Sequence, residues 1–287
     1  MINLSSAALF KRKIALDIQV NNIIKTYSDV LVDKFNLKID FNITKTMGSL
    51  GDRGTITITG LSLDDAGALS TCMMNIGKEA PPRNFVQLMV GYESDYGVIF
   101  TGGVFKVSSN LDTPDMSVTL DVKPGYDASR ISQIEINDKP ATLMGICQKA
   151  ASVLQAPLNF TAEDKQYSEY NFKGTVFQLL DNLQRTVPMT KRIYYSDNIL
   201  HVEDTAVPGS DVILISGESG LIGTPQASMQ GINFKCLLMP KLKVGGMVQI
   251  VSRKLPLLNG LYKIQTLQMQ GGNRSNPYFC NVFGIRL

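Results

Sequence analysis

Histidine and tryptophan are the scarcest residues of this chain, which has one histidine and no tryptophan among its 287 residues. Zinc sites take several nitrogen, sulfur or carboxylate ligands. The four cysteines, Cys72, Cys147, Cys236 and Cys280, form no CxxC pair and follow no metal-ligand spacing. We therefore expect no metal and no cofactor, and we interpret the cysteines as buried free thiols, which suits a reducing cytoplasm.

Long apolar runs are also missing. No stretch approaches the roughly 18 apolar residues of a membrane-spanning helix, so we predict no membrane span. The first residues, Met1 to Ser6, show no basic region followed by an apolar one, so we expect no signal peptide. The hydrophobic fraction of 44% and the charged fraction of 18% indicate a globular protein with a real core. A chain of this length predicts two domains or three.

Acidic residues are absent from the last part of the chain. All 25 of them precede Ser219, whereas eight of the 28 basic residues follow Glu218. This asymmetry predicts an acidic partner for the basic part, and a solvated basic face without a binding role is the alternative. The eight are Lys235, Lys241, Lys243, Arg253, Lys254, Lys263, Arg274 and Arg286.

Alternating apolar and polar residues dominate the first 125 positions. Ile14 to Val20, Leu37 to Ile43 and Thr55 to Thr59 each follow the period of two that is typical of a strand with one buried face. A short helix is predicted from Ser62 or Asp64 to about Met73. Further strands are predicted at Phe85–Tyr92, Gly97–Gly102, Gly103–Val107 and Met116–Val122, and together they favour a barrel or a sandwich.

The middle of the chain follows a different pattern. Helical spacing of apolar residues predicts one helix from Ala141 to Leu154, with Pro140 near its first turn, and a second from Thr175 to about Val187. A hairpin follows, with its turn at Ser196-Asp197-Asn198. Strands then resume at Val212–Ile215, Gly231–Met239, Met247–Val251, Leu261–Met269 and Phe279–Ile285. The order predicts a mainly β (α+β) fold with a small α+β insert.

A search for catalytic groups finds no constellation, and we expect no catalytic residue. His201 lies on a predicted hairpin strand without a GxSxG elbow. Acidic pairs occur at Asp64-Asp65, Glu163-Asp164 and Glu203-Asp204, beside turns and helix starts, where acids commonly act as caps. The glycine-rich stretch from Gly217 to Gly223 has no helix after it, so turn formation explains it better than phosphate binding.

Several passages resemble the phage baseplate hub proteins, which belong with the late-control-D group and the barrel part of type VI secretion spike proteins. The similarity extends from about residue 12 to the end. The passages are Ser219–Gln226 with Gln230–Val248 ("GLIG.P", then "G..F.CLL.P.L..G..V"), Tyr92 with Gly97–Val104 ("G.IFTG.V"), Phe172–Leu180 ("F.G", then "LL"), Lys13–Val20, and the "I.ITGLS" run around Ile58.

The resemblance implies a structural subunit of the virion tail baseplate, made in the host cytoplasm. It implies two barrels similar to the tail-tube subunit, a homotrimeric ring between a hexameric tail tube protein and a trimeric central spike protein, contacts with other baseplate proteins, and DNA that passes through the lumen without specific binding. It implies no enzymatic activity.

On this basis we expect a tube-like barrel region at 1–128, whose strands from about 84 to 128 can contribute to the second barrel. We expect the α+β insert at 129–207, and strands completing the second barrel at 208–287. Because a positive lumen would hold DNA phosphates, we also expect Lys241, Lys243, Arg253 and Lys254 to face a neighbouring protomer or the tube.

Two other functions remain open from the residues alone. The basic C-terminal part carries Tyr262, Tyr278, Phe279 and Phe283, which a single-stranded nucleic-acid-binding barrel would use for stacking. The acidic pairs would serve a tail-associated cell-wall hydrolase.

Overall fold

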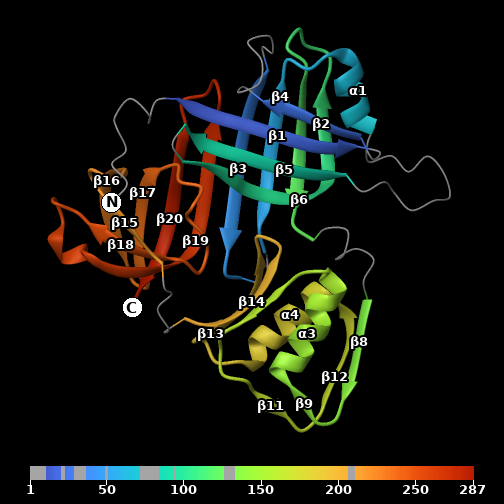
Figure 1. Ribbon diagram of the computed structural model, residues 1–287, viewed down its shortest axis with the longest axis vertical. Helices are drawn as coiled ribbons and strands as arrows, with labels where there is room; N and C mark the ends of the chain where they lie inside the picture. The colour runs from blue at the N-terminus through green and yellow to red at the C-terminus, as the bar shows by residue number, and fades with distance from the viewer. Residues whose placement is uncertain are drawn as a thin grey trace.

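The computed structural model of the protein shows a mainly β chain with few helices (Figure 1). This confirms the predicted fold class. The structure describes residues 11–20, 23–28, 37–48, 51–71, 84–93, 95–125, 133–205 and 211–287. Cys72 and Met73 lie outside these residues.

One sheet of 13 strands organises most of the molecule. Its order is β16-β17-β20-β19-β3-β4-β7-β6-β5-β1-β2, with β18 joined to β19 and β15 joined to β18. Strands from the two ends of the chain therefore lie side by side, since β19 pairs with β3. The strands are β1 (Arg12–Val20), β2 (Ile23–Ser28), β3 (Lys38–Thr46), β4 (Arg53–Thr59), β5 (Phe85–Tyr92), β6 (Asp95–Asn110), β7 (Ser117–Lys123), β15 (Val212–Ser216), β16 (Leu221–Ser228), β17 (Gly231–Leu237), β18 (Met247–Val251), β19 (Gly260–Gly272) and β20 (Tyr278–Arg286).

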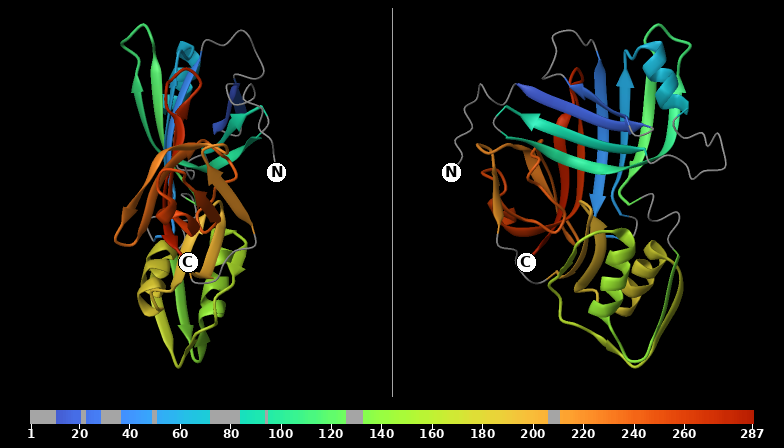
Figure 2. Two further views of the ribbon diagram at one scale, coloured as in Figure 1. Left: turned by 90° about the vertical axis from the view of Figure 1, so that its left-hand side faces the viewer. Right: turned by 45° about the vertical axis from the view of Figure 1, so that its right-hand side comes forward.

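The sheet folds over itself and encloses the main core. Strands β1, β2 and β5 cross one side of the layer that holds β3 and β4 (Figure 2). Alternate residues of both layers point between them and are buried, among them Leu16, Leu88, Ile43 and Ile56. Helix α1 (Leu63–Thr71) adds Ala66 and Leu69 to this core. Each such aliphatic side chain contributes about 1.5–3 kcal/mol when it is fully buried.

Strand β6 makes the corner at which the sheet changes layer. Its first half pairs with β5 and its second half with β7, and the register shifts between Val104 and Lys106. An ideal Cβ on Gly102 would lie 2.7 Å from the carbonyl oxygen of Lys123, so the corner requires a glycine there. The prediction of two separate strands in this stretch was wrong, because Gly102-Gly103 lets one strand bend instead of ending it.

The middle of the chain forms an α+β module below the sheet (Figure 1). Its own core holds Ile146, Leu179, Leu183 and Val202. The elements are β8 (Gln133–Asp138), β9 (Ala141–Thr142), α3 (Leu143–Leu154), β10 (Leu158–Phe160), β11 (Gln166–Tyr167), β12 (Tyr170–Thr175), α4 (Val176–Thr186), β13 (Lys191–Ser196) and β14 (Ile199–Asp204).

Both predicted helices of the module are present, with side-chain caps at their first residues. Thr142 Oγ1 accepts a hydrogen bond from Gly145 N, and Thr175 forms a capping box with Gln178. Pro140, expected near the first turn of α3, lies two residues before the N-cap Thr142, and β9 separates it from the helix. The turn at Asp197-Asn198 has positive φ at both residues, as a two-residue hairpin turn requires.

The N-terminal strands are fastened to the last hairpin by one arginine and one tyrosine. Arg12 Nη1 and Nη2 donate to the carbonyl oxygens of Ser275 and Asn276, at 2.5 and 3.2 Å. The Tyr278 hydroxyl accepts from Gly91 N at 2.9 Å and donates to Gly91 O at 2.7 Å. The guanidinium of Arg12 also lies 4.8 Å from the centre of the Tyr278 ring. These contacts tie β1 and β5 to β19 and β20.

Candidate functional site

One face of the long sheet is covered by polar side chains across seven neighbouring strands, β17, β20, β19, β3, β4, β7 and the second half of β6. It faces away from β1 and β5, whereas the alternate residues of the same strands are buried. We call this face the polar wall. Its residues are Asn233, Lys235, Phe279, Asn281, Phe283, Thr266, Gln268, Gln270, Lys38, Asp40, Asn42, Thr44, Thr46, Arg53, Thr55, Thr57, Thr59, Ser117, Thr119, Asp121, Lys106, Ser108 and Asn110.

Side chains of the polar wall bond to one another from strand to strand. Gln268 Nε2 donates to Asn42 Oδ1 at 3.0 Å, and Asn281 Nδ2 donates to Gln268 Oε1 at 3.3 Å. Further along the sheet, the Thr55 hydroxyl donates to Asp121 at 2.9 Å. Such pairs satisfy polar groups within the surface itself. The wall is therefore wettable but offers few free donors for a ligand to capture.

Thr57 and Thr119 continue this pattern, with their hydroxyl oxygens 3.0 Å apart. Both residues are β-branched and fit an exposed strand position. The outward-facing positions of these strands are thus occupied mainly by threonine, asparagine and glutamine, whereas the alternate, core-facing positions carry mainly aliphatic residues.

Six residues of the polar wall are charged, four of them basic, and Arg53 among these is exposed. Lys38 forms an ion pair with Asp40 at 3.0 Å, and Lys106 lies opposite Asp121 in the register of β6 and β7. The Lys235 ammonium lies 3.4 Å from the centre of the Phe279 ring. This last contact is the feature that resembles the basic, aromatic groove of nucleic-acid-binding barrels.

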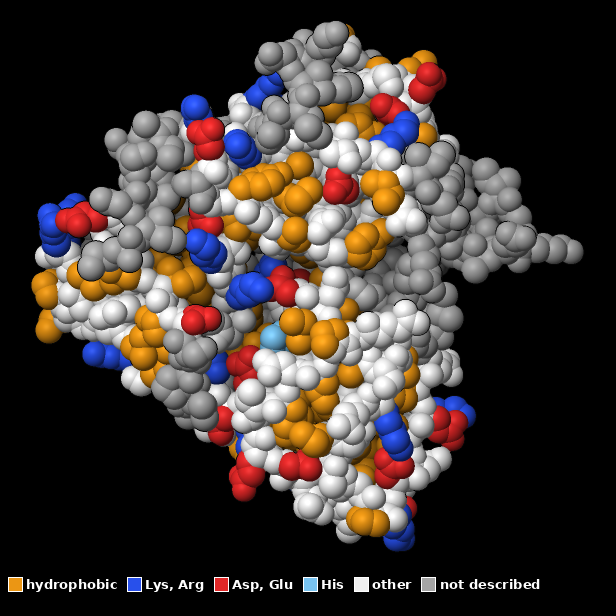
Figure 3. Space-filling model, in the orientation of Figure 1, with side chains coloured by type: hydrophobic (Ala, Val, Ile, Leu, Met, Phe, Trp, Pro, Cys, Tyr) orange, Lys and Arg blue, Asp and Glu red, His pale blue; other side chains and the backbone are white. Residues whose placement is uncertain are grey.

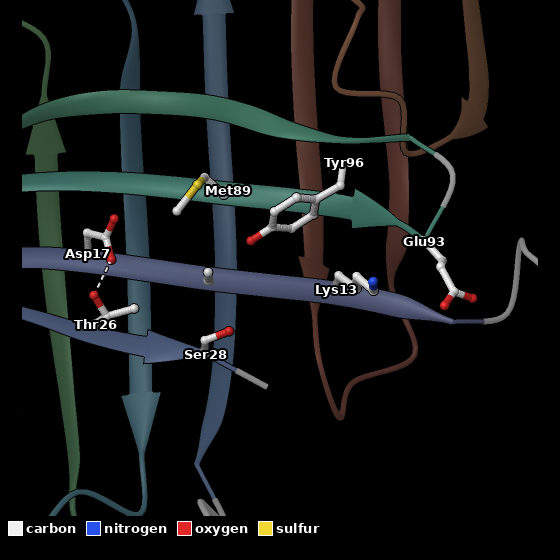
Figure 4. A pocket seen from close by; sticks show the side chains of 8 residues that line it. Lys13, Asp17, Thr26, Ser28, Met89, Glu93 and Tyr96 are labelled. Carbon is white, nitrogen blue, oxygen red and sulfur yellow. Dashed lines mark hydrogen bonds between the residues drawn. The ribbon is translucent and has the colours of Figure 1, made fainter. Parts of the chain in front are cut away.

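The opposite face, over β1 and β5, has a different character. Hydrophobic side chains gather there in Figure 3. A shallow hollow of about 430 Å³ lies on it, and Figure 4 shows Met89 between Asp17 and Tyr96. The carboxylate of Asp17 accepts a hydrogen bond from Thr26 at 2.7 Å. The two outer faces of the folded sheet therefore differ: one carries mainly polar side chains, with Phe279 and Phe283 among them, and the other carries an apolar patch.

A buried polar cluster joins the α+β module to the sheet. Lys263 Nζ of β19 lies 3.0 Å from Glu203 Oε2 of β14, and their side chains are 4% and 13% exposed. Glu203 Oε1 also accepts a hydrogen bond from the Tyr194 hydroxyl at 2.8 Å. The ring of His201 stacks on that of Tyr194 at 4.8 Å.

A second group of contacts crosses the same boundary. Lys45 of β3, 2% exposed, forms an ion pair with Asp197 in the hairpin turn. Ser196 Oγ donates to Asp52 Oδ2 at 2.7 Å. We call both groups together the polar junction: Lys45, Asp52, Tyr194, Ser196, Asp197, His201, Glu203 and Lys263. Buried ion pairs of this kind define geometry more than they stabilise it.

Two carboxyl groups of the polar junction, those of Asp52 and Glu203, have shifted pKa values. Burial raises the pKa of Asp52 to about 6, against the opposing effects of the Lys45 charge and the Ser196 hydrogen bond. Burial also acts to raise the pKa of Glu203, but hydrogen bonds from His201 and Lys263, the Lys263 charge and the Tyr194 hydroxyl outweigh it and lower that pKa to about 2. Glu203 is therefore held as a carboxylate.

The candidate residues from the sequence have structural contacts in the fold. His201 lies in the polar junction, 3.4 Å from Glu203 Oε1. Asp65 N donates to Ser62 Oγ at the start of α1, as a helix cap. Asp164 Oδ1 accepts from Met144 N at 2.9 Å, at the start of α3. The acidic pairs thus lie on different elements, and their contacts do not assemble them around one cleft.

The described residues include three of the four cysteines and the glycine-rich stretch from Gly217 to Gly223. Cys147, Cys236 and Cys280 are buried free thiols. Gly220 and Gly223 have φ of +108° and +73°; Gly220 directly precedes β16 and Gly223 lies within it, so no helix follows the stretch. The register of β16 against β17 shifts between Ile222 and Gln226, so these glycines shape a turn and a bulge.

Basic residues of the C-terminal stretch after Glu218, which contains no acidic residue, form ion pairs with carboxylates from earlier in the same chain. Lys241 Nζ lies 3.2 Å from Asp95, and Arg253 Nη2 lies 2.7 Å from Glu218. Lys263 pairs with Glu203 in the polar junction. All three carboxylates precede residue 219. A part of the charge asymmetry is therefore neutralised by the fold itself, without a second protein.

Lys241 and Lys243 lie between β17 and β18, and Arg253 and Lys254 lie between β18 and β19. These four residues are outside the strands that form the polar wall. Within the described ranges, no group of three or more His, Cys, Asp or Glu could hold a metal ion. Among the helices of the described residues, none has the length and hydropathy of a membrane span.

Comparisons with known proteins identify relatives of the fold. The family model "Baseplate hub gp41" matches residues 15–284. The 43 kDa tail protein of prophage MuSo2 from Shewanella oneidensis aligns with a TM-score of 0.65 and 8% identity, over 95% of this chain and 96% of that one. The tail protein from Neisseria meningitidis aligns with a TM-score of 0.63 and 9% identity, over 95% and 96%.

A component of the E. coli type VI secretion system aligns with a TM-score of 0.58 and 9% identity, over 89% of this chain and 76% of that one. That protein is described as structurally similar to bacteriophage T4 tail proteins. At these identities the similarity shows a shared fold. No curated protein matches the sequence.

Proposed function

This chain belongs to the baseplate hub gp41 family, and from that premise we propose that it is a non-enzymatic hub subunit whose three copies close a ring with the polar wall facing the lumen. The ring adapts a hexameric tail tube to a trimeric central spike, and DNA passes through it. Identical subunits close a ring through heterologous contacts between neighbouring copies.

The polar wall is the observation that carries this proposal. A channel for DNA has to be wetted, so an apolar lining would be unfavourable. It also has to release phosphates, and each strong phosphate contact with lysine or arginine slows release. Asn42, Gln268 and Asn281 bond to one another, and Thr57 pairs with Thr119, so these neutral side chains of the wall meet both requirements.

The distribution of basic residues supports the same orientation. Lys241 and Arg253 are paired with Asp95 and Glu218, and lie in connections outside the wall strands. We propose that Lys243 and Lys254, in the same two connections, face a neighbouring protomer or the tube. This orientation leaves the cations of the polar wall in the lumen: Lys38 is paired with Asp40, Lys106 lies opposite Asp121, and Lys235 lies against Phe279. Arg53 is exposed on the same face.

We also propose the division into two tube-like barrel regions at 1–128 and 208–287, with the α+β module at 129–207. The separate core of the module supports this division. The strands β5 to β7 pair with β1 and β4, and β19 joins the two regions through β3. Other baseplate proteins would contact the surfaces that lie away from the lumen, including the apolar patch over β1 and β5.

Cysteine labelling of the assembled ring tests the orientation. Asn42→Cys and Thr55→Cys place thiols on exposed positions of the wall, and Gln148→Cys on α3 is the matched control. We expect a small maleimide to label all three, and a maleimide coupled to a large polymer to label Gln148→Cys alone once the ring has formed. Equal labelling of all three by the large reagent in a verified trimer would exclude a lumen-facing wall.

A further inference from the structure

Two buried thiols face each other across neighbouring strands. Cys236 of β17 and Cys280 of β20 are directly opposite in the antiparallel register, and both side chains are fully buried. Met269 of β19 lies opposite Cys280 on its other side and is also fully buried. None of these three sulfur atoms has a part in the polar wall or in the polar junction.

Antiparallel geometry places this pair within disulfide range. Directly opposite residues have Cα atoms about 4.5–5.5 Å apart and side chains on the same face, and disulfides span Cα separations of about 4.4–6.8 Å. Both side chains are buried between the same strands, directly opposite each other. Bond formation therefore requires rotation of side chains and little movement of the backbone.

The surroundings keep the pair slow to react in the folded state. The hydrogen bond to Cys280 and burial raise the pKa of the Cys236 thiol, and a thiol is a much weaker nucleophile than a thiolate. The route to the pair is local opening at the edge of the sheet. β17 has β16 as its other neighbour, β16 ends the sheet, and its pairing is interrupted between Ile222 and Gln226.

We propose that Cys236 and Cys280 are an oxidative modification site, which a small-molecule disulfide converts into a cross-strand disulfide between β17 and β20. One thiolate attacks the reagent disulfide, forms a mixed disulfide and releases one reagent thiol. The second thiolate then attacks the protein sulfur and releases the other reagent thiol. The two cysteines lose two electrons and two protons, and the reagent gains them.

The bond would fasten the last strand of the chain to β17 and close a loop that contains the 43 residues between the two positions. It would form after the protein leaves a reducing compartment, and it does not depend on ring formation. Cys147, buried in the separate core of the module, serves as the unpaired comparison.

The test treats the full chain, in a Cys72→Ser background, with oxidised glutathione at urea concentrations below the unfolding transition. Free thiols are then alkylated and the protein is mapped by mass spectrometry without reduction. We expect one peptide pair joined through Cys236 and Cys280, an alkylated Cys147, and a urea midpoint that rises after oxidation and returns on reduction. Separate alkylation of Cys236 and Cys280 after prolonged oxidation would overturn the proposal, as would crosslinks shared randomly with Cys147.

Two variants separate the pair from general oxidation. Cys147→Ser should leave both the crosslink and the rise in midpoint unchanged. Cys236→Ser should abolish both and leave Cys280 as a mixed disulfide with glutathione. Persistence of the midpoint rise in Cys236→Ser would contradict the assignment, because the stabilisation would then come from another site.

Discussion

Replacing the Lys263 ammonium in the polar junction by an apolar group should destabilise the protein strongly. In Lys263→Met the methylene chain is retained, but Glu203 loses its cation at 3.0 Å, and the Asp204 carbonyl loses a donor at 3.1 Å. Glu203 is 13% exposed, so water replaces the ammonium poorly. Leaving one member of a buried pair uncompensated costs about 3–5 kcal/mol.

The shifted pKa of Glu203 gives an independent magnitude. A pKa near 2 in place of the ordinary 4.5 corresponds to about 3 kcal/mol of preference for the charged form, at about 1.4 kcal/mol per pKa unit. Both routes give a loss that is a large share of the roughly 5–15 kcal/mol stability of a typical domain. Because His201 and Tyr194 also hold Glu203, the lower end of the range is the better expectation.

Urea unfolding followed by far-ultraviolet circular dichroism measures the loss, since the chain has no tryptophan for fluorescence. Arg253→Met is the matched control: its ion pair with Glu218 is 2.7 Å long but 89% and 83% exposed, so we expect a change below about 1 kcal/mol. The double variant Lys263→Met with Glu203→Gln should recover about 1–3 kcal/mol relative to the sum of the single variants. A loss in Lys263→Met as small as in Arg253→Met, or strict additivity in the double variant, would refute the reasoning.

Three further predictions concern pH, the sheet corner and the fastening of the N-terminal strands. The folded-state pKa of Asp52 near 6 lies above its ordinary 3.8, so stability should rise as pH falls from 7 to about 5; Glu203, held near 2, should then lose its contribution as pH falls from 4.5 toward 2. Urea midpoints of the wild type and of Asp52→Asn measured across this range check it, and a rise that persists in Asp52→Asn would contradict it. Gly102→Ala should cost about 1–3 kcal/mol because its Cβ meets the Lys123 carbonyl at 2.7 Å, whereas Gly97→Ala, with its nearest contact at 3.5 Å, should change little; similar thermal midpoints for the two variants would disprove the corner argument. Tyr278→Phe should cost about 1–3 kcal/mol by unpairing buried groups of Gly91, and hydrogen exchange at Gly91 should speed up; unchanged exchange there would show that the hydroxyl does not fasten β5.

Strands and helices with a clean local period were predictable from the sequence. The alternation of Leu37 to Ile43 predicted β3, and the spacing of Val176, Leu179 and Leu183 predicted α4. Strand β2 was not predicted, because Ile23-Ile24-Lys25-Thr26 has no alternation to mark a buried face. Strand β16 was read as turns, because Gly223 and Pro225 interrupt it. Local patterns thus identify regular strands and miss those with bulges or exposed edges.

The polar wall could have been found in part from the same alternation. Asn42 and Thr44 in β3, like Thr55 and Thr57 in β4, occupy the positions opposite to the buried residues. What the sequence could not provide is the order of the strands, since β3 meets β19 across more than two hundred residues. Without that order, the polar positions of separate strands do not add up to one continuous surface.

No local sequence pattern predicted the polar junction. Lys45 lies on the buried side of β3, and its partner Asp197 lies in a hairpin of another module. In the sequence, a lysine at a strand position that should be apolar only interrupts the alternating pattern. Its ion pair becomes evident once the hairpin of the module is placed beside β3. The sequence predicted no catalytic role for His201, and it could not predict the contact with Glu203 or the stacking on Tyr194, because both depend on the folded hairpin.

Electron cryomicroscopy of the hub assembled with its tail tests the central claim most directly, because it places individual strands relative to the channel. The account predicts three copies of the chain around the axis, with Asn42, Thr55, Gln268 and Asn281 lining the lumen and the face of β1 and β5 directed outward. A map in which β3, β4 and β19 turn their polar face toward the exterior, or bury it between protomers, would contradict it.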